Sequence, residues 1–190
     1  MKFNPKIHHC RSIRLKGYDY SQEGLYFITI CCENNICRFG NIENEEMILN
    51  DFGQIAHNEW LNLAERFDNF ELDTFQIMPN HIHSIISLKV KIGQSASNDN
   101  ENSENNSCLE IWAGASPAPT TADIIGSYKS LVANGCLGIY KSKNEIMGKL
   151  WQRNYYEHII RDENSYQTIS NYVENNPSKW LEDKFFTKAY

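Results

Sequence analysis

The sequence predicts an α+β fold in which an antiparallel sheet carries helices on one face. Short runs of aromatic and β-branched residues alternate with stretches whose apolar residues recur at helical spacing. The chain has 190 residues, of which 41% are hydrophobic, and this is enough for one domain with a sizeable core. We therefore expect a single domain over residues 25–190, preceded by an arm at residues 1–24.

The first half of the chain begins with an aromatic and β-branched run that is typical of a buried central strand. Two short apolar runs around a polar turn then predict a hairpin that elaborates the main sheet. An amphipathic helix follows, with Asn50 or Asp51 as its N-cap. In order, we expect a strand at 25–32, hairpin strands at 36–42 and 46–49, and a helix up to residue 67.

The second half of the chain is divided by a polar, low-complexity segment at residues 91–120. Its composition cannot bury enough apolar surface to order it, so we interpret it as a mobile surface insert. The elements around it are strands at 70–78 and 81–88, a helix from about residue 121, a strand at 150–160, and a helix over 162–176 that Pro177 ends.

The order of these elements predicts the topology of the sheet. Without the hairpin it is β-α-β-β-α-β, which is the ferredoxin-like plan. In this plan the two inner strands of the sheet have one open face, and the last helix is a C-terminal addition.

Charge is unevenly distributed along the chain. The net charge of −6 argues mildly against wholesale nucleic-acid binding, but residues 1–16 carry +5 and the remainder therefore carries −11. A basic arm ahead of an acidic body is typical of nucleic-acid-binding tails, although a solubilising terminus has the same composition.

The six cysteines include no Cys-x-x-Cys pair, which argues against a zinc ribbon and a disulfide framework. Reduced thiols in a cytoplasm are the better interpretation. No apolar run has the length of a membrane span, and the first residues do not have a signal-peptide pattern. We expect a cytoplasmic protein without a membrane partner.

A His-x-His pair, His81 and His83, lies at the start of the strand at 81–88. Side chains on a strand alternate between faces, so both imidazoles emerge on one side and form a ready pair of metal ligands. In isolation such a pair more often lies on a solvated strand face. The last helix, however, carries Tyr172 and Asn176, which are four residues apart and therefore neighbours on one helix face.

Three motifs in this order resemble the REP-associated tyrosine transposases, which are relatives of the small single-strand-DNA transposases of the HUH superfamily. They are Pro-Asn-His-Ile-His at 79–83, Trp-Gln-Arg-Asn-Tyr-Tyr-Glu-His-Ile-Ile-Arg at 151–161, and Tyr-Val-Glu-Asn-Asn-Pro at 172–177. The segment at 9–20 is also similar to the start of many family members. Each motif alone is weak, but the ordered set is specific and covers the chain except for residues 91–120.

The resemblance implies a site and a reaction. His81, His83 and Asn176 would hold a divalent metal, Mg²⁺ or Mn²⁺, and Tyr172 would be the nucleophile. The implied activity is metal-dependent nicking and rejoining of single-stranded DNA at hairpin or REP-like elements through a 5′-phosphotyrosine. A cation offsets charge on the transferring phosphate, and the covalent link conserves bond energy for rejoining. Members of these families act as monomers or homodimers.

Several side chains remain alternatives for the same roles. Tyr155, Tyr156 and Tyr166 are rival nucleophiles, although one of the first two packs in the core and Tyr166 belongs to an apolar stripe. His158 is either an extra ligand or base or a structural strand histidine. Pro177 disfavours helical geometry at Asn176, which weakens the helix-neighbour argument there.

Candidate DNA contacts are basic or polar side chains in the arm, on the second helix and beside the last strand. Basic groups would hold phosphates without reading sequence. These candidates are Arg11, Arg14, Lys16, Lys129, Gln152 and Arg153.

Two other functions fit the same fold. One is a non-catalytic single-stranded nucleic-acid-binding domain, which needs exposed aromatic residues on its central strands but no His-x-His pair. The other is an HUH replication initiator or relaxase, which is usually larger.

Overall fold

The computed structural model describes residues 22–89 and 119–187. The basic arm, with Arg11, Arg14 and Lys16, and nearly all of the insert at 91–120 lie outside the described residues.

Four strands form one antiparallel sheet in the order β4-β5-β1-β6. With the β2–β3 hairpin set aside, this is the ferredoxin-like arrangement, and the predicted fold class is confirmed. The strands of the sheet are β1 (Gly24–Cys31), β4 (Phe70–Ile77), β5 (His81–Leu88) and β6 (Tyr156–Ile160). The hairpin consists of β2 (Gly40–Glu43) and β3 (Glu46–Leu49).

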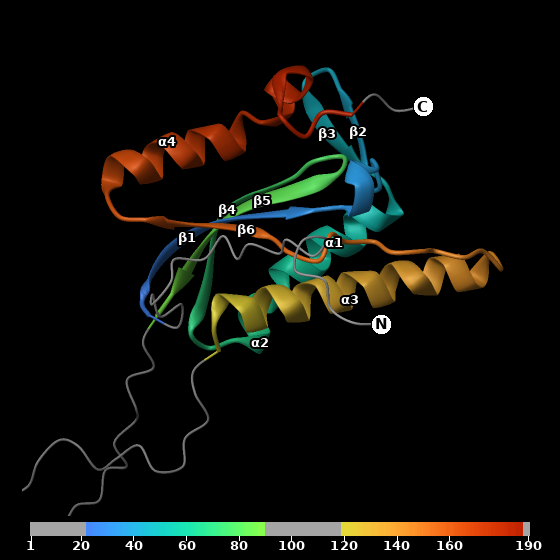
Figure 1. Cartoon of the computed structure of the whole chain (residues 1–190), viewed down its shortest axis with the longest axis horizontal. Helices are drawn as coiled ribbons and strands as arrows, with labels where there is room; N and C mark the ends of the chain where they lie inside the picture. Colours follow the sequence, from blue (N-terminus) through green and yellow to red (C-terminus); the bar gives the residue numbers. More distant parts are fainter. Residues whose placement is uncertain (1–21, 90–118, 188–190) are drawn as a thin grey trace, which may run out of the picture.

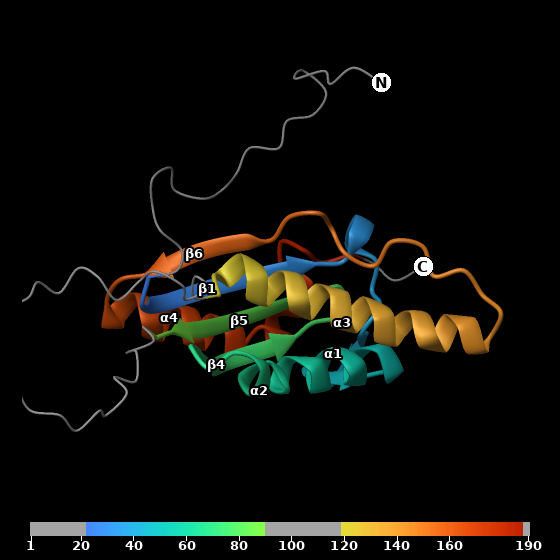
Figure 2. The same ribbon diagram turned by 90° about the horizontal axis from the view of Figure 1, so that it is seen from below.

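Helices lie on both sides of the sheet, as Figure 1 and Figure 2 show. The helices α1 (Asp51–Leu61), α2 (Leu63–Arg66) and α3 (Thr121–Ser142) lie on one side, and the core fills the space between them and the sheet. The tyrosine-bearing helix α4 (Glu163–Glu174) lies on the other side, against β4 and β5. Two short 3₁₀ helices complete the fold, η1 (Glu33–Asn35) and η2 (Pro177–Glu182).

The strand alternation sorts side chains between the two faces. Tyr26, Ile28 and Ile30 of β1 belong to the core cluster on the α1–α3 side. Phe27 and Thr29 therefore face α4, as do the residues that oppose them on the neighbouring strands. This second face carries the candidate site.

Helix starts follow the sequence signals closely. The Asn50 side chain accepts a hydrogen bond from the Gly53 N–H, as the N-cap prediction requires. Thr120 and Asp123 form a capping box at the start of α3. The first helix ends six residues earlier than expected, at Leu61, and a separate turn, α2, follows Asn62.

Two strands are shorter than expected because their backbone bonds to other elements. The N–H groups of Arg38 and Phe39 both donate to the Pro79 carbonyl, so β2 starts only at Gly40. At residues 152 and 153 the carbonyls accept hydrogen bonds from the Lys129 ammonium, and β6 starts only at Tyr156.

The backbone at Asn176 is helical, with φ −62° and ψ −39°, although the following proline disfavours this region. Pro177 opens η2, where its missing N–H is not needed. Within the described residues, none of the helices is long and apolar enough to cross a bilayer.

Candidate metal and tyrosine site

The two histidines of the pair lie on β5 and face α4. Both side chains are fully buried, opposite Cys31 and Thr29 of β1. The solvated strand face that isolated pairs usually occupy is therefore not their environment.

The His81 ring has one nitrogen fixed and one free. Its Nδ1 lies 2.8 Å from Asn80 Oδ1. The Asn80 amide nitrogen already donates to the carbonyls of Phe185 and Asn35, so its oxygen faces the ring and accepts the Nδ1 proton. Nε2 is then the unprotonated nitrogen, and it is buried without a hydrogen-bond partner among residues 22–89 and 119–187.

The His83 ring is held at both nitrogens. Nδ1 lies 2.8 Å from Thr29 Oγ1, and Nε2 lies 3.0 Å from the Tyr172 hydroxyl. Phe27 stacks on the ring with 5.3 Å between centroids. These contacts fix the ring plane with Nε2 directed at α4.

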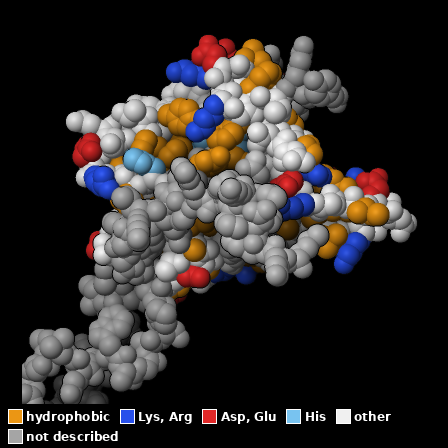
Figure 3. Space-filling view, in the orientation of Figure 1, with side chains coloured by type: hydrophobic (Ala, Val, Ile, Leu, Met, Phe, Trp, Pro, Cys, Tyr) orange, Lys and Arg blue, Asp and Glu red, His pale blue; other side chains and the backbone are white. Residues whose placement is uncertain are grey.

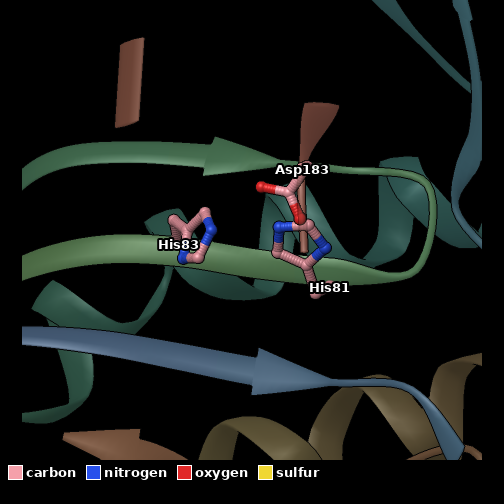
Figure 4. Close-up of side chains that lie close together, drawn as sticks. All are labelled: His81, His83 and Asp183. Carbon is pink, nitrogen blue, oxygen red and sulfur yellow. The ribbon is translucent and has the colours of Figure 1, made fainter. Parts of the chain in front are cut away.

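Asp183 is the third member of the cluster, and the sequence did not indicate it. Ligand atoms of His81, His83 and Asp183 all lie within 4.8 Å of one another, and within the described chain this is the only such group of histidine, cysteine and acidic residues. Figure 4 shows the carboxylate directed at the two rings. Oδ1 accepts the Phe185 N–H at 2.6 Å, and Oδ2 accepts the Asn176 amide at 2.9 Å.

Tyr172 reaches this cluster from the same chain. Its hydroxyl lies 3.0 Å from His83 Nε2 and 3.2 Å from Asp183 Oδ2, while 38% of the residue stays exposed. Burial, and then the negative charge of Asp183, raises the pKa of the hydroxyl above its ordinary value. The tyrosine is therefore protonated near neutral pH, and it opens on a hollow of about 340 Å³ that Asn171, Asn175 and Lys179 also line.

Asn176 lies beside the cluster, as its spacing from Tyr172 predicts. Its Nδ2 donates to Asp183, but Oδ1 is buried and has no hydrogen-bond partner in the part of the chain that the structure describes. A buried amide oxygen without a partner is uncommon and is explained readily by an absent ion or water.

The residues present fit a divalent cation. Two buried acceptors, His81 Nε2 and Asn176 Oδ1, have no hydrogen-bond partner among the described residues. The Asp183 carboxylate lies within 4.8 Å of both histidine ligand atoms and accepts the Asn176 amide. Burial lowers the pKa of His81 to about 4 and also lowers the pKa of His83, so both rings are neutral and able to ligate at neutral pH. Imidazole nitrogens with carboxylate and amide oxygens suit a metal of intermediate to hard character.

The rival side chains lie elsewhere. The Tyr166 hydroxyl donates to the Asp73 carboxylate at 3.0 Å, beside β4. Tyr155 packs against the core cluster, and Tyr156 is 46% exposed on the open face of β6. His158 is exposed on the same face and is outside the metal-ligand cluster.

The described DNA-contact candidates differ in how free their side chains are. The Lys129 ammonium lies 2.7 Å from the Gln152 carbonyl and 3.1 Å from that of Arg153, which makes it a support for this loop. The Gln152 amide donates to Asn35 Oδ1. Arg153 is exposed. A role in DNA binding stays a prediction for all three.

The fold and the site thus define the class of protein: a ferredoxin-like domain with a buried His-x-His pair and an adjacent tyrosine. A Haemophilus influenzae protein described only as uncharacterized is 43% identical over 185 residues, and the match covers 97% of each chain. The chain belongs to the same protein family as this relative. No protein-family model matches the chain.

Two solved structures are also similar. A REP-associated tyrosine transposase bound to a REP hairpin aligns with a TM-score of 0.47 and 16% identity, over 87% of this chain and 74% of its own. A candidate transposase of Deinococcus radiodurans aligns with a TM-score of 0.46 and 15% identity, over 85% of this chain and 95% of its own. The first is a member of the family that the motifs resemble. Similarity at this level assigns no activity to this chain.

Proposed function

We propose that this protein is a metal-dependent tyrosine transposase that nicks and rejoins single-stranded DNA. The observation that carries the proposal is the position of the Tyr172 hydroxyl, 3.0 Å from His83 Nε2 and 3.2 Å from Asp183 Oδ2. A nucleophile beside a set of metal ligands is the arrangement that phosphoryl transfer needs. The motif resemblance adds a hairpin or REP-like element as the DNA target.

The reaction is a transesterification. The Tyr172 oxygen attacks the scissile phosphorus, a tyrosine O–P bond forms and the P–O3′ bond breaks, leaving a 5′-phosphotyrosine and a free 3′-OH. The Tyr172 hydroxyl donates a hydrogen bond to the Asp183 carboxylate, which stays ionised as a ligand. The tyrosine proton passes to water, and the departing 3′ oxygen takes up a proton from water. In the reverse direction a 3′-OH attacks the phosphotyrosine, so rejoining needs no external energy source.

His81, His83, Asp183 and Asn176 supply the ligand atoms for the cation. When bound, Mg²⁺ or Mn²⁺ polarises the phosphate and offsets charge that develops on its oxygens. The protein fixes the donors beforehand: Asn80 sets the His81 tautomer, and Phe185 holds the carboxylate of Asp183 through its backbone N–H.

The test is covalent capture of DNA. The full chain is incubated with a labelled hairpin oligonucleotide that has single-stranded flanks, with Mn²⁺ or with EDTA, and adducts are separated on a denaturing gel. We expect an adduct only with Mn²⁺. His81→Ala and His83→Ala should lose it, because each removes a ligand nitrogen.

Tyr172→Phe should lose the adduct while keeping most of the affinity for the hairpin. Tyr166→Phe is the matched control, because this hydroxyl bonds to the exposed Asp73 carboxylate beside β4 and lies outside the metal-ligand cluster, and it should keep the adduct. Hairpin binding without any adduct from the unmodified chain would favour the non-catalytic nucleic-acid-binding domain. An adduct that persists in Tyr172→Phe would overturn the choice of nucleophile.

A further inference from the structure

The β6 side of the site-bearing sheet face extends beyond the part that α4 covers. This helix packs against β4 and β5, whereas Tyr156 of β6 is 46% exposed and His158 of β6 is also exposed. In the space-filling view of Figure 3, hydrophobic side chains gather on this part of the molecule, with a histidine and basic groups beside them.

The β6 side carries ring side chains in adjacent positions. Phe27 opposes His158, and Thr29 opposes Tyr156, so these residues share one face of the β1–β6 pair. The Tyr156 ring lies 6.1 Å from that of Phe185. We call the exposed Tyr156 and His158, together with the half-buried Phe27 and the buried Phe185 next to them, the aromatic surface.

The aromatic surface is continuous with the candidate site. Phe27 stacks on His83 at 5.3 Å and meets the Tyr172 ring edge-on at 6.2 Å. Phe185 lies 4.7 Å from the His81 ring and is two residues from Asp183. A polymer whose backbone phosphate is held at Tyr172 therefore has rings within reach on the β6 side.

A cation accompanies the rings. The exposed Lys184 ammonium lies 4.7 Å from the Phe185 ring centroid and 5.8 Å from that of Tyr156. A hollow of about 410 Å³ continues this side between His158 and the first turns of α4, and Ser165 and Thr168 line it. Flat rings with one lysine and hydroxyl groups match an unpaired base and its phosphate better than they match an apolar peptide.

We propose that the aromatic surface binds the single-stranded nucleotides that flank the scissile phosphate, with Tyr156 stacking on one base and Lys184 contacting one phosphate. The inference rests on the proposed function for its substrate class. The occupant is single-stranded DNA because every base has a ring face for stacking, while a paired duplex hides these faces. Tyr156 and Lys184 position the substrate and touch no reacting atom.

The experiment measures binding without chemistry. All variants are made in the full chain with Tyr172→Phe, and fluorescence anisotropy compares a hairpin with single-stranded flanks against the same hairpin without flanks. Tyr156→Leu should weaken binding of the flanked hairpin about 5- to 150-fold, the range that one base stack provides. It should leave the unflanked hairpin within about twofold, and Tyr156→Phe should restore the affinity.

Two further readouts separate stacking from a general defect. A 2-aminopurine placed at each flank position in turn should be quenched at one position, and Tyr156→Leu should remove this quenching. Lys184→Gln should lower the salt slope of flanked-hairpin binding by about 0.7, the value for one phosphate on single-stranded DNA. Melting curves by circular dichroism check that both exposed positions leave the fold intact.

The outcomes are distinguishable from failure of the proposed function. If the unmodified chain forms no adduct but Tyr156→Leu loses flank-specific binding, the proposed activity fails and the aromatic surface stands. If Tyr156→Leu binds the flanked hairpin and the unflanked hairpin as tightly as the parent does, the aromatic surface does not bind the flank. Equal weakening of both hairpins would also overturn the inference.

Discussion

Asp183 is the residue that the site geometry adds to the candidate ligands, because the sequence did not indicate it. It accepts hydrogen bonds from the Asn176 amide and the Tyr172 hydroxyl while its ligand oxygens stay within 4.8 Å of both histidines. A single carboxylate thus contacts the proposed nucleophile and lies beside both candidate histidine ligands. A neutral amide in its place would keep the shape but remove the charge that attracts a cation.

Asp183→Asn should weaken Mn²⁺ binding at least about tenfold, the scale on which residues around a metal tune affinity. Isothermal titration calorimetry of the full chain with Mn²⁺ measures this directly. Glu182→Gln is the control, because this exposed neighbour lies outside the cluster and should leave the affinity unchanged. Equal affinities for Asp183→Asn and the parent would remove Asp183 from the ligand set.

Buried thiols give a second prediction at this scale. Burial raises the pKa of Cys136 to about 11 and raises that of Cys32 further. A raised pKa means less thiolate at a given pH, so roughly one Cys136 side chain in a thousand is reactive at pH 8.

We expect iodoacetamide to modify Cys136 very slowly at pH 8, with a rate that rises about tenfold per pH unit towards pH 10. Peptide mapping by mass spectrometry measures the rate, and the partly buried Cys37 serves as comparison. Rapid labelling of Cys136 at pH 8 in the folded protein would contradict the buried environment.

Strand alternation was enough to predict that His81 and His83 share one face, and helix spacing was enough to pair Tyr172 with Asn176. Asp183 could not be predicted in this way. It follows a 3₁₀ helix, and its position depends on the chain reversing after Pro177 so that Phe185 packs on His81. No period in the sequence encodes that reversal.

The contacts of Lys129 also could not be predicted from sequence spacing. Its place on the second helix suggested a phosphate contact, which stays a prediction, and the side chain also donates to two carbonyls of the loop before β6. Sequence spacing gives the helix face and not the loop that packs on it.

At the scale of elements, α1 and α3 approach each other closely at one glycine. A Cβ built on Gly135 would lie 2.8 Å from Ile55 Cγ2, whereas one on Gly138 would have no neighbour within 4 Å. The structure separates a packing position from an open one.

Gly138→Ala should raise the free energy of unfolding by about 1 kcal/mol, because alanine has the higher helix propensity and meets no neighbour. Gly135→Ala should lose most or all of this gain, since Ile55 has to shift. Chemical denaturation with urea compares the two variants with the parent. A Gly135→Ala variant as stable as Gly138→Ala would mean that the helices are farther apart than described.

The C-terminal segment after η2 acts as an element although it has no regular structure. Asn80 Nδ2 donates to the Phe185 carbonyl at 2.8 Å, and the Thr187 hydroxyl donates to the Asn35 carbonyl at 2.9 Å. The first bond ties the segment to the turn that precedes His81, and the second ties it to η1. The Pro-Asn-His-Ile-His motif therefore carries the two candidate metal ligands, and its Asn80 also anchors the segment that carries Asp183.

At the scale of the whole molecule, one chain contains a complete set of site residues. Tyr172 reaches His83 and Asp183 of its own chain, so no exchange of α4 between subunits is needed. The sequence left this open, because spacing cannot say whether a helix packs on its own sheet or on that of a partner.

Mixing two inactive variants tests this arrangement. His81→Ala with His83→Ala in one chain, and Tyr172→Phe in the other, should give no covalent adduct when combined, because neither chain has a complete site. Formation of adduct in the mixture, at a level near one quarter to one half of the parent, would show that tyrosine and histidines come from different subunits.

The central claim is that Tyr172 is the covalent nucleophile, and the most direct measurement is to locate the attached nucleotide. The parent chain is reacted with the flanked hairpin and Mn²⁺, digested with nuclease and trypsin, and mapped by tandem mass spectrometry. We expect a 5′-nucleotide on the peptide that contains Tyr172 and on that tyrosine. Attachment at Tyr155, Tyr156 or Tyr166 would contradict the account.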